Sequence, residues 1–200
     1  MKALIGAMRC GAVLARFITD LILARACIVD ATIWQLMFPK FAEVIAAVED
    51  LKARGLIQEY AIFGAVAQAF WDEAIPTFDL DVLVLMAGQG AVLTDLGPLY
   101  RWADERGYPT QGEHIVIGEI PVQFVPTPTA LHEEAVQTAE TLSLEGLPLR
   151  VVRPEYLIAT WLQPPANSHA RKERAAKLRE SGQVDPEVLA DVLARFGLSW

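Results

Sequence analysis

The amino-acid sequence predicts an α/β (α+β) fold, in which helices flank a small mixed β-sheet and a helical tail follows. The chain has 200 residues, 53% of them hydrophobic and 21% charged, which suits one folded core with a small appendage. Short β-rich runs alternate with helical patterns up to about residue 152. Beyond Pro154 only helical patterns remain. We therefore expect a core over residues 37–152 and a C-terminal helical segment over residues 153–200.

The first 36 residues form a separate, strongly apolar extension. Charged residues interrupt its apolar run from Ala3 to Trp34, and ionised groups are costly in a bilayer, so no membrane span is expected. Arg16, Asp20 and Arg25 are among them. One reading is a helix that packs on the domain or on a partner, including a second copy of the chain. The other is upstream sequence, with Met37 as the natural start.

The core opens with a helix and a short strand. From Phe41 the apolar residues recur at steps of three and four, which predicts an amphipathic helix that ends at Gly55. A β-rich run from Tyr60 to Phe63 follows, and Gly64 closes it. Strand and glycine turn thus stand directly before the next predicted helix.

The centre of the core alternates between helices and strands. We expect a helix over Ala65 to Trp71, broken by Pro76, and then the most strand-like segment, Phe78 to Met86. Gly88 and Gly90 indicate a turn. The remaining core elements are a helix from Leu93 to Arg106, strands at His114 to Ile117 and Ile120 to Val125 joined around Gly118, a helix near Thr129, and strands at Thr141 to Leu144 and Leu149 to Val152.

The tail is predicted to contain three helices. Pro154 suits the first turn of a helix over Glu155 to Leu162, which Pro164 and Pro165 end. Two further helices are expected over His169 to Glu180 and Pro186 to Phe196. Asp185 is the expected N-cap of the last one, and Gly197 its stop.

The net charge and the cysteines limit the function. With 25 acidic and 17 basic residues the net charge is −8, which disfavours non-specific binding to DNA, RNA or anionic membranes. Cys10 and Cys27 are the only cysteines, too few for a disulfide framework. A cytoplasmic location fits this composition best.

Two carboxylates make the strand at 78–86 the most informative segment. Side chains at i and i+2 of a strand share a face, so Asp79 and Asp81 are expected to project together, opposite Phe78, Leu80 and Val82. Paired carboxylates repel each other unless a cation or water reaches them, and Mg²⁺ is the natural cation. The alternative is that both line the solvent face of an edge strand.

The glycine turn before this strand suggests a phosphate site. Without a β-carbon at Gly64 the backbone can approach a phosphate, and the N–H groups at the start of the following helix, from Ala65 on, point at that anion. A metal site and a phosphate site would then be neighbours.

These segments resemble a known superfamily. Tyr60-Ala61-Ile62-Phe63-Gly64-Ala65-Val66-Ala67, followed by Thr77-Phe78-Asp79-Leu80-Asp81-Val82, is similar to the glycine turn and D-x-D strand of the DNA polymerase beta-like nucleotidyltransferases. More narrowly it resembles the AbiEii-type, or minimal nucleotidyltransferase, group, which includes type IV toxin-antitoxin enzymes. The tail from Val152 to Leu198 is similar to that group's C-terminal helices.

The resemblance implies a transferase of the nucleotidyltransferase fold. It implies transfer of a nucleoside monophosphate from a nucleoside triphosphate to an RNA or protein acceptor, with Mg²⁺ held by Asp79 and Asp81 as catalytic residues. It places the basic run of Arg171, Lys172 and Arg174 beside the cleft, where we expect Arg171 and Lys172 to offset the triphosphate charge, although such a run is also typical of a solvated helix face. A cognate antitoxin is a candidate partner.

The sequence also departs from the pattern. The usual Gly-Ser or Gly-Gly turn is Gly64-Ala65, which removes a hydroxyl. Gln123 stands where a third carboxylate is expected, and a neutral amide cannot act as a general base. The alternative function is therefore a catalytically impaired nucleotide-binding or protein-interaction module with the same fold.

Overall fold

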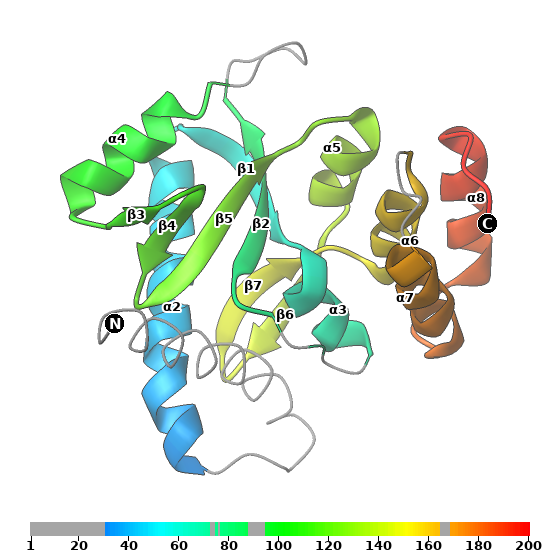
Figure 1. The fold of residues 1–200 in the computed structure, drawn as a ribbon, viewed down its shortest axis with the longest axis horizontal. Coiled ribbons are helices and arrows are strands. Elements are labelled where there is room, and N and C mark those ends of the chain that lie inside the picture. Colours follow the sequence, from blue (N-terminus) through cyan, green and yellow to red (C-terminus); the bar gives the residue numbers. More distant parts are fainter. Residues whose placement is uncertain (1–30, 73–74, 76, 88–94, 165–168) are drawn as a thin grey trace, which may run out of the picture.

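The computed structural model describes residues 31–72, 75, 77–87, 95–164 and 169–200, with side chains from Phe38 onward. Within these residues seven strands form one mixed sheet in the order β3-β4-β5-β2-β1-β7-β6 (Figure 1). The strands are β1 Ile57–Ile62, β2 Leu80–Met86, β3 Thr110–Gln111, β4 His114–Ile117, β5 Ile120–Pro126, β6 Glu140–Leu144 and β7 Leu147–Val151. The predicted α/β fold class with a mixed sheet is confirmed.

Helices cover this sheet and form the tail. They are α2 Ala31–Ala53, α3 Gly64–Trp71, α4 Gly97–Arg106, α5 Ala130–Gln137, α6 Pro154–Leu162, α7 His169–Glu180 and α8 Pro186–Arg195. Helix α2 packs against β1, β4 and β5, whereas α5 packs against β1 and β2. The tail helices α6, α7 and α8 stand together on the side of the fold away from α4 (Figure 1).

The central strand pairing brings two distant segments together. Strands β1 and β2 are antiparallel, and Ile62 at the end of β1 pairs with Val82 near the start of β2. The turn that follows β1 therefore lies beside the residues that open β2. On its other side β2 runs parallel to β5, with Asp81 opposite Gln123. This register positions the candidate site at one end of the three central strands.

The first helix is longer than the sequence predicted. Its apolar stripe is buried as expected, with Val44, Val48 and Leu51 at 0% exposure, but α2 begins at Ala31 rather than near Phe41. One continuous helix thus crosses the boundary that we expected between residues 36 and 37. The apolar run from Ala3 to Trp34 lies for the most part outside the described residues.

The predicted strand at 78–86 differs at its start. Strand β2 begins at Leu80, so Asp79 immediately precedes it. Leu80 and Val82 are buried as predicted, but Phe78 is 60% exposed. The alternating pattern does not extend to Phe78 because the strand has not yet begun there. The predicted turn at Gly88 and Gly90 lies outside the described residues.

The other core elements match closely. Helix α4 starts at Gly97, with Pro98 in its first turn, and not at Leu93, which lies outside the described residues. The two strands around Gly118 form an antiparallel pair with Ile117 opposite Ile120. The short strand β3 was not predicted, since two exposed residues carry no alternating pattern.

The tail docks through one almost wholly buried helix. All nine residues of α6 are buried, and the helix contacts α3, α5, α7 and α8. Asp185 caps α8 as predicted, because its carboxylate accepts hydrogen bonds from the backbone N–H groups of Glu187 and Val188. Every described helix lacks the combination of length and apolar composition needed to traverse a bilayer.

Candidate functional site

The turn between β1 and α3 adopts a conformation that favours glycine. Phe63 is extended, and Gly64 follows with φ +63°, in the left-handed region. The Phe63 N–H donates a hydrogen bond of 2.9 Å to the carbonyl oxygen of Asp81. The turn is therefore fastened directly to the opening of β2, and helix α3 starts beside it.

Gly64 and the Asp81 carboxylate leave no room for a side chain between them. A β-carbon on Gly64 would lie 2.1 Å from Oδ2 of Asp81. Glycine is thus needed at this position for two independent reasons, the backbone conformation and the approach of the carboxylate. The expected neighbourhood of the glycine turn and the acidic strand is present in the fold.

The two aspartates have different environments. Thr77 donates a 2.7 Å hydrogen bond to Oδ1 of Asp79, and Oδ2 of Asp79 lies 3.2 Å from Nε2 of His114. Among the described residues, no side chain donates a hydrogen bond to the carboxylate of Asp81. Burial, and next the neighbouring Asp79 carboxylate, raise the pKa of Asp81 to about 6, while His114 acts weakly in the opposite direction.

A row of polar side chains crosses the sheet beside Asp81. Gln123 of β5 pairs in parallel register with Asp81 and in antiparallel register with His114 of β4. Residues paired in this way point to the same face of a sheet. Gln123 therefore lies between the Asp81 carboxylate and the His114 imidazole. The family resemblance of the sequence implies a third carboxylate at this position.

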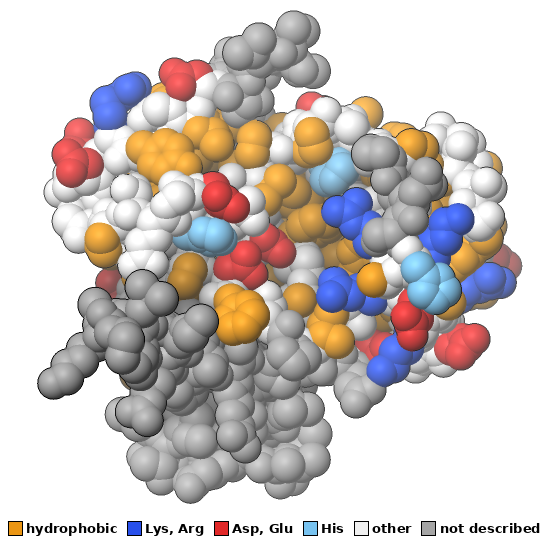
Figure 2. All heavy atoms as spheres, viewed as in Figure 1, with side chains coloured by type: hydrophobic (Ala, Val, Ile, Leu, Met, Phe, Trp, Pro, Cys, Tyr) orange, Lys and Arg blue, Asp and Glu red, His pale blue; other side chains and the backbone are white. Residues whose placement is uncertain are grey.

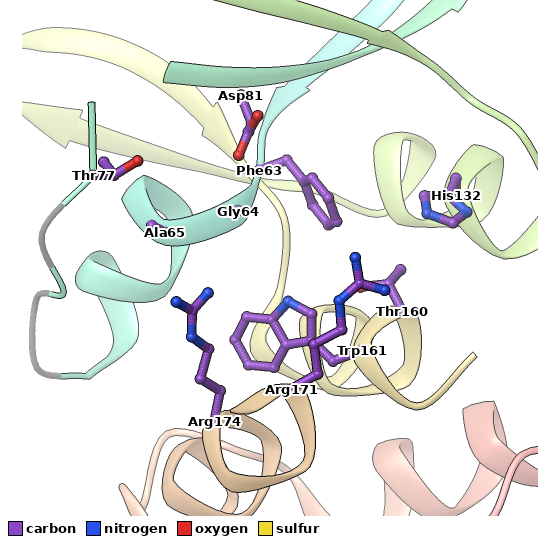
Figure 3. A pocket seen from close by; sticks show the side chains of 10 residues that line it. All are labelled: Phe63, Gly64, Ala65, Thr77, Asp81, His132, Thr160, Trp161, Arg171 and Arg174. Atoms are coloured by element: carbon purple, nitrogen blue, oxygen red, sulfur yellow. The ribbon is translucent and has the colours of Figure 1, made fainter. Parts of the chain in front are cut away.

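A pocket of about 290 Å³ opens beside this row. Gly64 and Ala65 line it at the start of α3, and Asp81 lines it from β2 (Figure 3). Arg171 and Arg174 reach into it from α7, on the opposite side from Asp81 (Figure 3). The other lining residues are Phe63, Thr77, His132, Thr160 and Trp161.

Opposite charges face each other over this region of the surface. Acidic side chains gather over the centre of the molecule, and Lys and Arg side chains gather over the tail helices, with hydrophobic side chains between them (Figure 2). A polyphosphate with a bound cation carries both charges, so it complements such a surface.

The basic residues of α7 divide according to the helical period. Arg171 and Arg174 are three residues apart and share the face that lines the pocket. Lys172, which we predicted as a phosphate ligand with Arg171, is exposed and is not among the lining residues. Of the three basic residues that the sequence analysis named in this run, Arg171 and Arg174 line the pocket.

His114 contacts Asp79, and the sequence did not predict this contact, because the three histidines of the chain have no metal-site spacing. A signal was nonetheless present. The two strands joined around Gly118 form a hairpin, and pairing Ile117 with Ile120 places His114 opposite Gln123. The register of the hairpin could therefore have placed the imidazole at the site.

The Mg²⁺ site expected at Asp79 and Asp81 stays a prediction. Within the described ranges no group of three or more His, Cys, Asp or Glu side chains is arranged to hold a metal ion. Mg²⁺ is commonly held by one or two carboxylates together with substrate phosphates and water. The mutual repulsion that raises the pKa of Asp81 would be relieved by such a cation.

Comparison with known proteins gives a distant structural likeness. No protein-family model matches the chain, and no curated protein matches it significantly. Among solved structures, the chain is similar to an antigenic nucleotidyltransferase-like protein from Paracoccidioides brasiliensis, with 14% sequence identity and a TM-score of 0.46. The match covers 79% of this chain and 87% of that protein.

Proposed function

We propose that this chain is a Mg²⁺-dependent nucleotidyltransferase that transfers a nucleoside monophosphate from a nucleoside triphosphate to a hydroxyl group of an RNA or protein acceptor. The single observation that carries the proposal is the contact between Gly64 and Asp81 at the edge of a pocket whose opposite wall is cationic. Phosphoryl transfer depends on positioning and charge stabilisation. A carboxylate can hold the metal ion, and an open backbone turn and arginine side chains can bind the phosphate oxygens.

The residues of the pocket would divide the work as follows. The backbone at Gly64 and Ala65 would approach the triphosphate, and Arg171 and Arg174 would bind its non-bridging oxygens from α7. Asp79 and Asp81 would hold Mg²⁺, which neutralises charge on the phosphates and polarises the reacting phosphorus. Thr77 and His114 orient Asp79 by contacting one carboxylate oxygen each.

The reaction balances without a further reagent. The acceptor oxygen forms a bond to the α-phosphorus, and the bond from that phosphorus to the bridging oxygen breaks. Pyrophosphate leaves, and the hydroxyl proton passes to solvent. Gln123 can donate a hydrogen bond to the acceptor but cannot take up this proton.

The test is transfer of label from an α-³²P nucleoside triphosphate in the presence of Mg²⁺. Wild-type protein should label an RNA or protein acceptor, and Asp79→Asn should abolish labelling while the fold is retained. Glu105→Gln is the matched control, since Glu105 is an exposed carboxylate of α4. Labelling that survives in Asp79→Asn would contradict the assigned role.

A second candidate function is nucleotide binding without turnover. The observation that favours it is the pairing of Asp81 with neutral Gln123, which stands on β5 where the resemblance implies a third carboxylate. Under this alternative, nucleotide binds but no label is transferred to any acceptor. Gln123→Glu would then be the informative variant, because a gain of transfer would show that only the missing carboxylate limits the reaction.

We propose a toxin-antitoxin role on the sequence resemblance alone. Induced expression should then slow growth of the host cell, and a neighbouring gene product should relieve the effect. Asp79→Asn should be harmless at equal expression. Growth arrest by Asp79→Asn would separate toxicity from nucleotide transfer.

The apolar extension is proposed to bring copies of the chain together. Helix α2 begins at Ala31, so deletion of residues 1–30 leaves it whole. The truncated protein should form particles with fewer copies of the chain than the full-length protein does, as measured by mass in solution divided by chain mass. An unchanged number of copies would remove this role from the extension.

A further inference from the structure

The pocket has a second end that carries aromatic side chains. Around Gly64, Ala65 and Arg174 the lining offers backbone and a cation, whereas at the other end the Phe63 and His132 rings lie on either side of Arg171 (Figure 3). The Phe63 ring meets the His132 ring edge to face, with centroids 6.1 Å apart and planes at 65°. An aromatic and imidazole wall is thus continuous with the phosphate half.

A chain of hydrogen bonds holds the His132 ring. Nε2 of Gln163 donates to Oγ1 of Thr129 over 3.2 Å, and this hydroxyl lies 2.8 Å from Nδ1 of His132. A hydroxyl has one proton and two acceptor positions, so it donates to Nδ1 in one tautomer of the ring and accepts from Nδ1–H in the other. The tautomer in which Nδ1 accepts from Thr129 carries its proton on Nε2.

The surroundings favour the neutral imidazole. Burial lowers the pKa of His132 below its ordinary value, and no described carboxylate is paired with the ring. In the tautomer in which Nδ1 accepts from Thr129, neutral His132 presents a single N–H donor, at Nε2. The ring is held on one side by Thr129 and on the other by Phe63.

The position of the α-phosphate favours the base at this end. The proposed metal site sets the reacting α-phosphate near Asp81, and the nucleoside is attached to that same phosphate. Phe63 adjoins Gly64 in the chain, its backbone N–H is bonded to Asp81, and its side chain lines the same pocket. The Phe63 ring is therefore an aromatic surface that the nucleoside can reach from this phosphate.

We propose that Phe63 and His132 form the nucleobase subsite of this pocket, with the base against the Phe63 ring and one of its acceptor atoms bonded to Nε2–H of His132. The inference rests on the proposed function. Nucleobases are planar, and their edges carry ring nitrogen and carbonyl acceptors, so they match an aromatic face beside a single donor. The subsite distinguishes a nucleoside triphosphate from a bare polyphosphate.

The test compares ATP with inorganic tripolyphosphate by calorimetry in the presence of Mg²⁺. Wild-type protein should bind ATP more tightly than tripolyphosphate. Phe63→Leu should weaken ATP at least about fivefold, the lower end of the cost of losing one base–aromatic contact, and leave tripolyphosphate binding unchanged. Phe196→Leu is the matched control, since Phe196 is a partly buried phenylalanine outside the pocket.

A pair of variants at position 132 tests the donor. His132→Phe keeps a ring but removes the N–H. This variant should weaken the binding of ATP and leave the binding of tripolyphosphate unchanged. His132→Gln retains an amide donor and should restore part of the affinity for ATP.

The outcomes separate the two proposals. Equal binding of ATP and tripolyphosphate by the wild type, or an equal loss of both ligands in Phe63→Leu, overturns the subsite and leaves the proposed function standing. Failure of the wild type to bind either ligand overturns both.

Discussion

Gly64 and Asp81 lie in contact where β1, α3 and β2 meet, and a β-carbon on Gly64 would stand 2.1 Å from Oδ2 of Asp81. The register of β1 and β2 produces this contact, because it sets the end of one strand beside the start of the other. The conformation of the turn at Gly64 and the position of the Asp81 carboxylate therefore constrain each other.

Gly64→Ala should destabilise the protein more than an alanine at another left-handed glycine. A left-handed conformation costs a non-glycine residue about 1–2 kcal/mol, and at Gly64 the clash with Asp81 adds to this. Gly55→Ala is the control, since Gly55 has φ +69° with nothing within 4 Å of an added β-carbon. Urea denaturation measures the free energy of unfolding of both variants. Equal losses of stability would contradict the close contact between Gly64 and Asp81.

The raised pKa of Asp81 predicts a pH-dependent stability difference. The unfolded carboxyl ionises near 3.8 and the folded one near 6, so between these values the folded state binds more protons. This group therefore lowers the free energy of unfolding as the pH rises through that window, by at most about 3 kcal/mol.

Asp81→Asn removes this dependence. The variant should gain stability relative to the wild type between pH 4 and pH 6 and hold that gain at pH 8, in buffer without Mg²⁺. Urea denaturation across this range measures the difference. A stability difference that does not change with pH would mean that Asp81 ionises normally in the folded protein.

The two faces of α7 should differ in their effect on nucleotide binding. Arg174 lines the pocket and Lys172 does not, although both are exposed residues of the same helix. Arg174→Gln should weaken binding of a nucleoside triphosphate by about tenfold, the scale of one lost charge-assisted hydrogen bond. Lys172→Gln should have little effect. Calorimetry at fixed ionic strength compares them, and an equal loss would indicate a general charge effect.

The tail should depend on a buried carboxylate at the start of α6. Glu155 is 1% exposed, and its Oε1 accepts a 2.8 Å hydrogen bond from the Asp185 N–H. Nε of Arg153 lies 3.3 Å from the other oxygen, but the pair is not aligned as a hydrogen bond. We therefore attribute the stabilising contribution of Glu155 to its hydrogen bond with the Asp185 N–H.

Glu155→Ala should therefore destabilise the protein by about 2 kcal/mol, because the Asp185 N–H loses its charged acceptor. Glu187→Ala is the control, since Glu187 is an exposed residue in the first turn of α8. Thermal unfolding compares the two variants. Similar losses would show that the buried carboxylate does not anchor the tail.

Periodicity and turn residues predicted most of this fold because they act locally. The burial of Val44, Val48 and Leu51 and the cap at Asp185 follow from residues within one or two turns. The start of β2 could not be predicted, since Phe78 has the character of a strand residue and only the tertiary pairing leaves it outside. The length of α2 before Phe41 was hidden for a similar reason, because an apolar run without polar alternation has no clear first residue.

The lining of the pocket was predicted in part. Gly64, Ala65 and Asp81 were predicted to lie together because the strand, turn and strand lie within about twenty residues. His132 lies on α5, far along the chain, and only the packing of that helix brings it to the pocket. Lys172 and Arg174 could not be distinguished without knowing which face of α7 meets the core.

Magnesium-dependent binding of a nucleoside triphosphate, followed by calorimetry in wild-type protein and in Asp81→Asn, tests the central claim most directly. We expect binding by the wild type that is lost on chelation with EDTA, and a loss of at least about tenfold in Asp81→Asn, with Asp104→Asn on the exposed face of α4 unchanged. Binding that is indifferent to Mg²⁺ and to Asp81 would contradict the account.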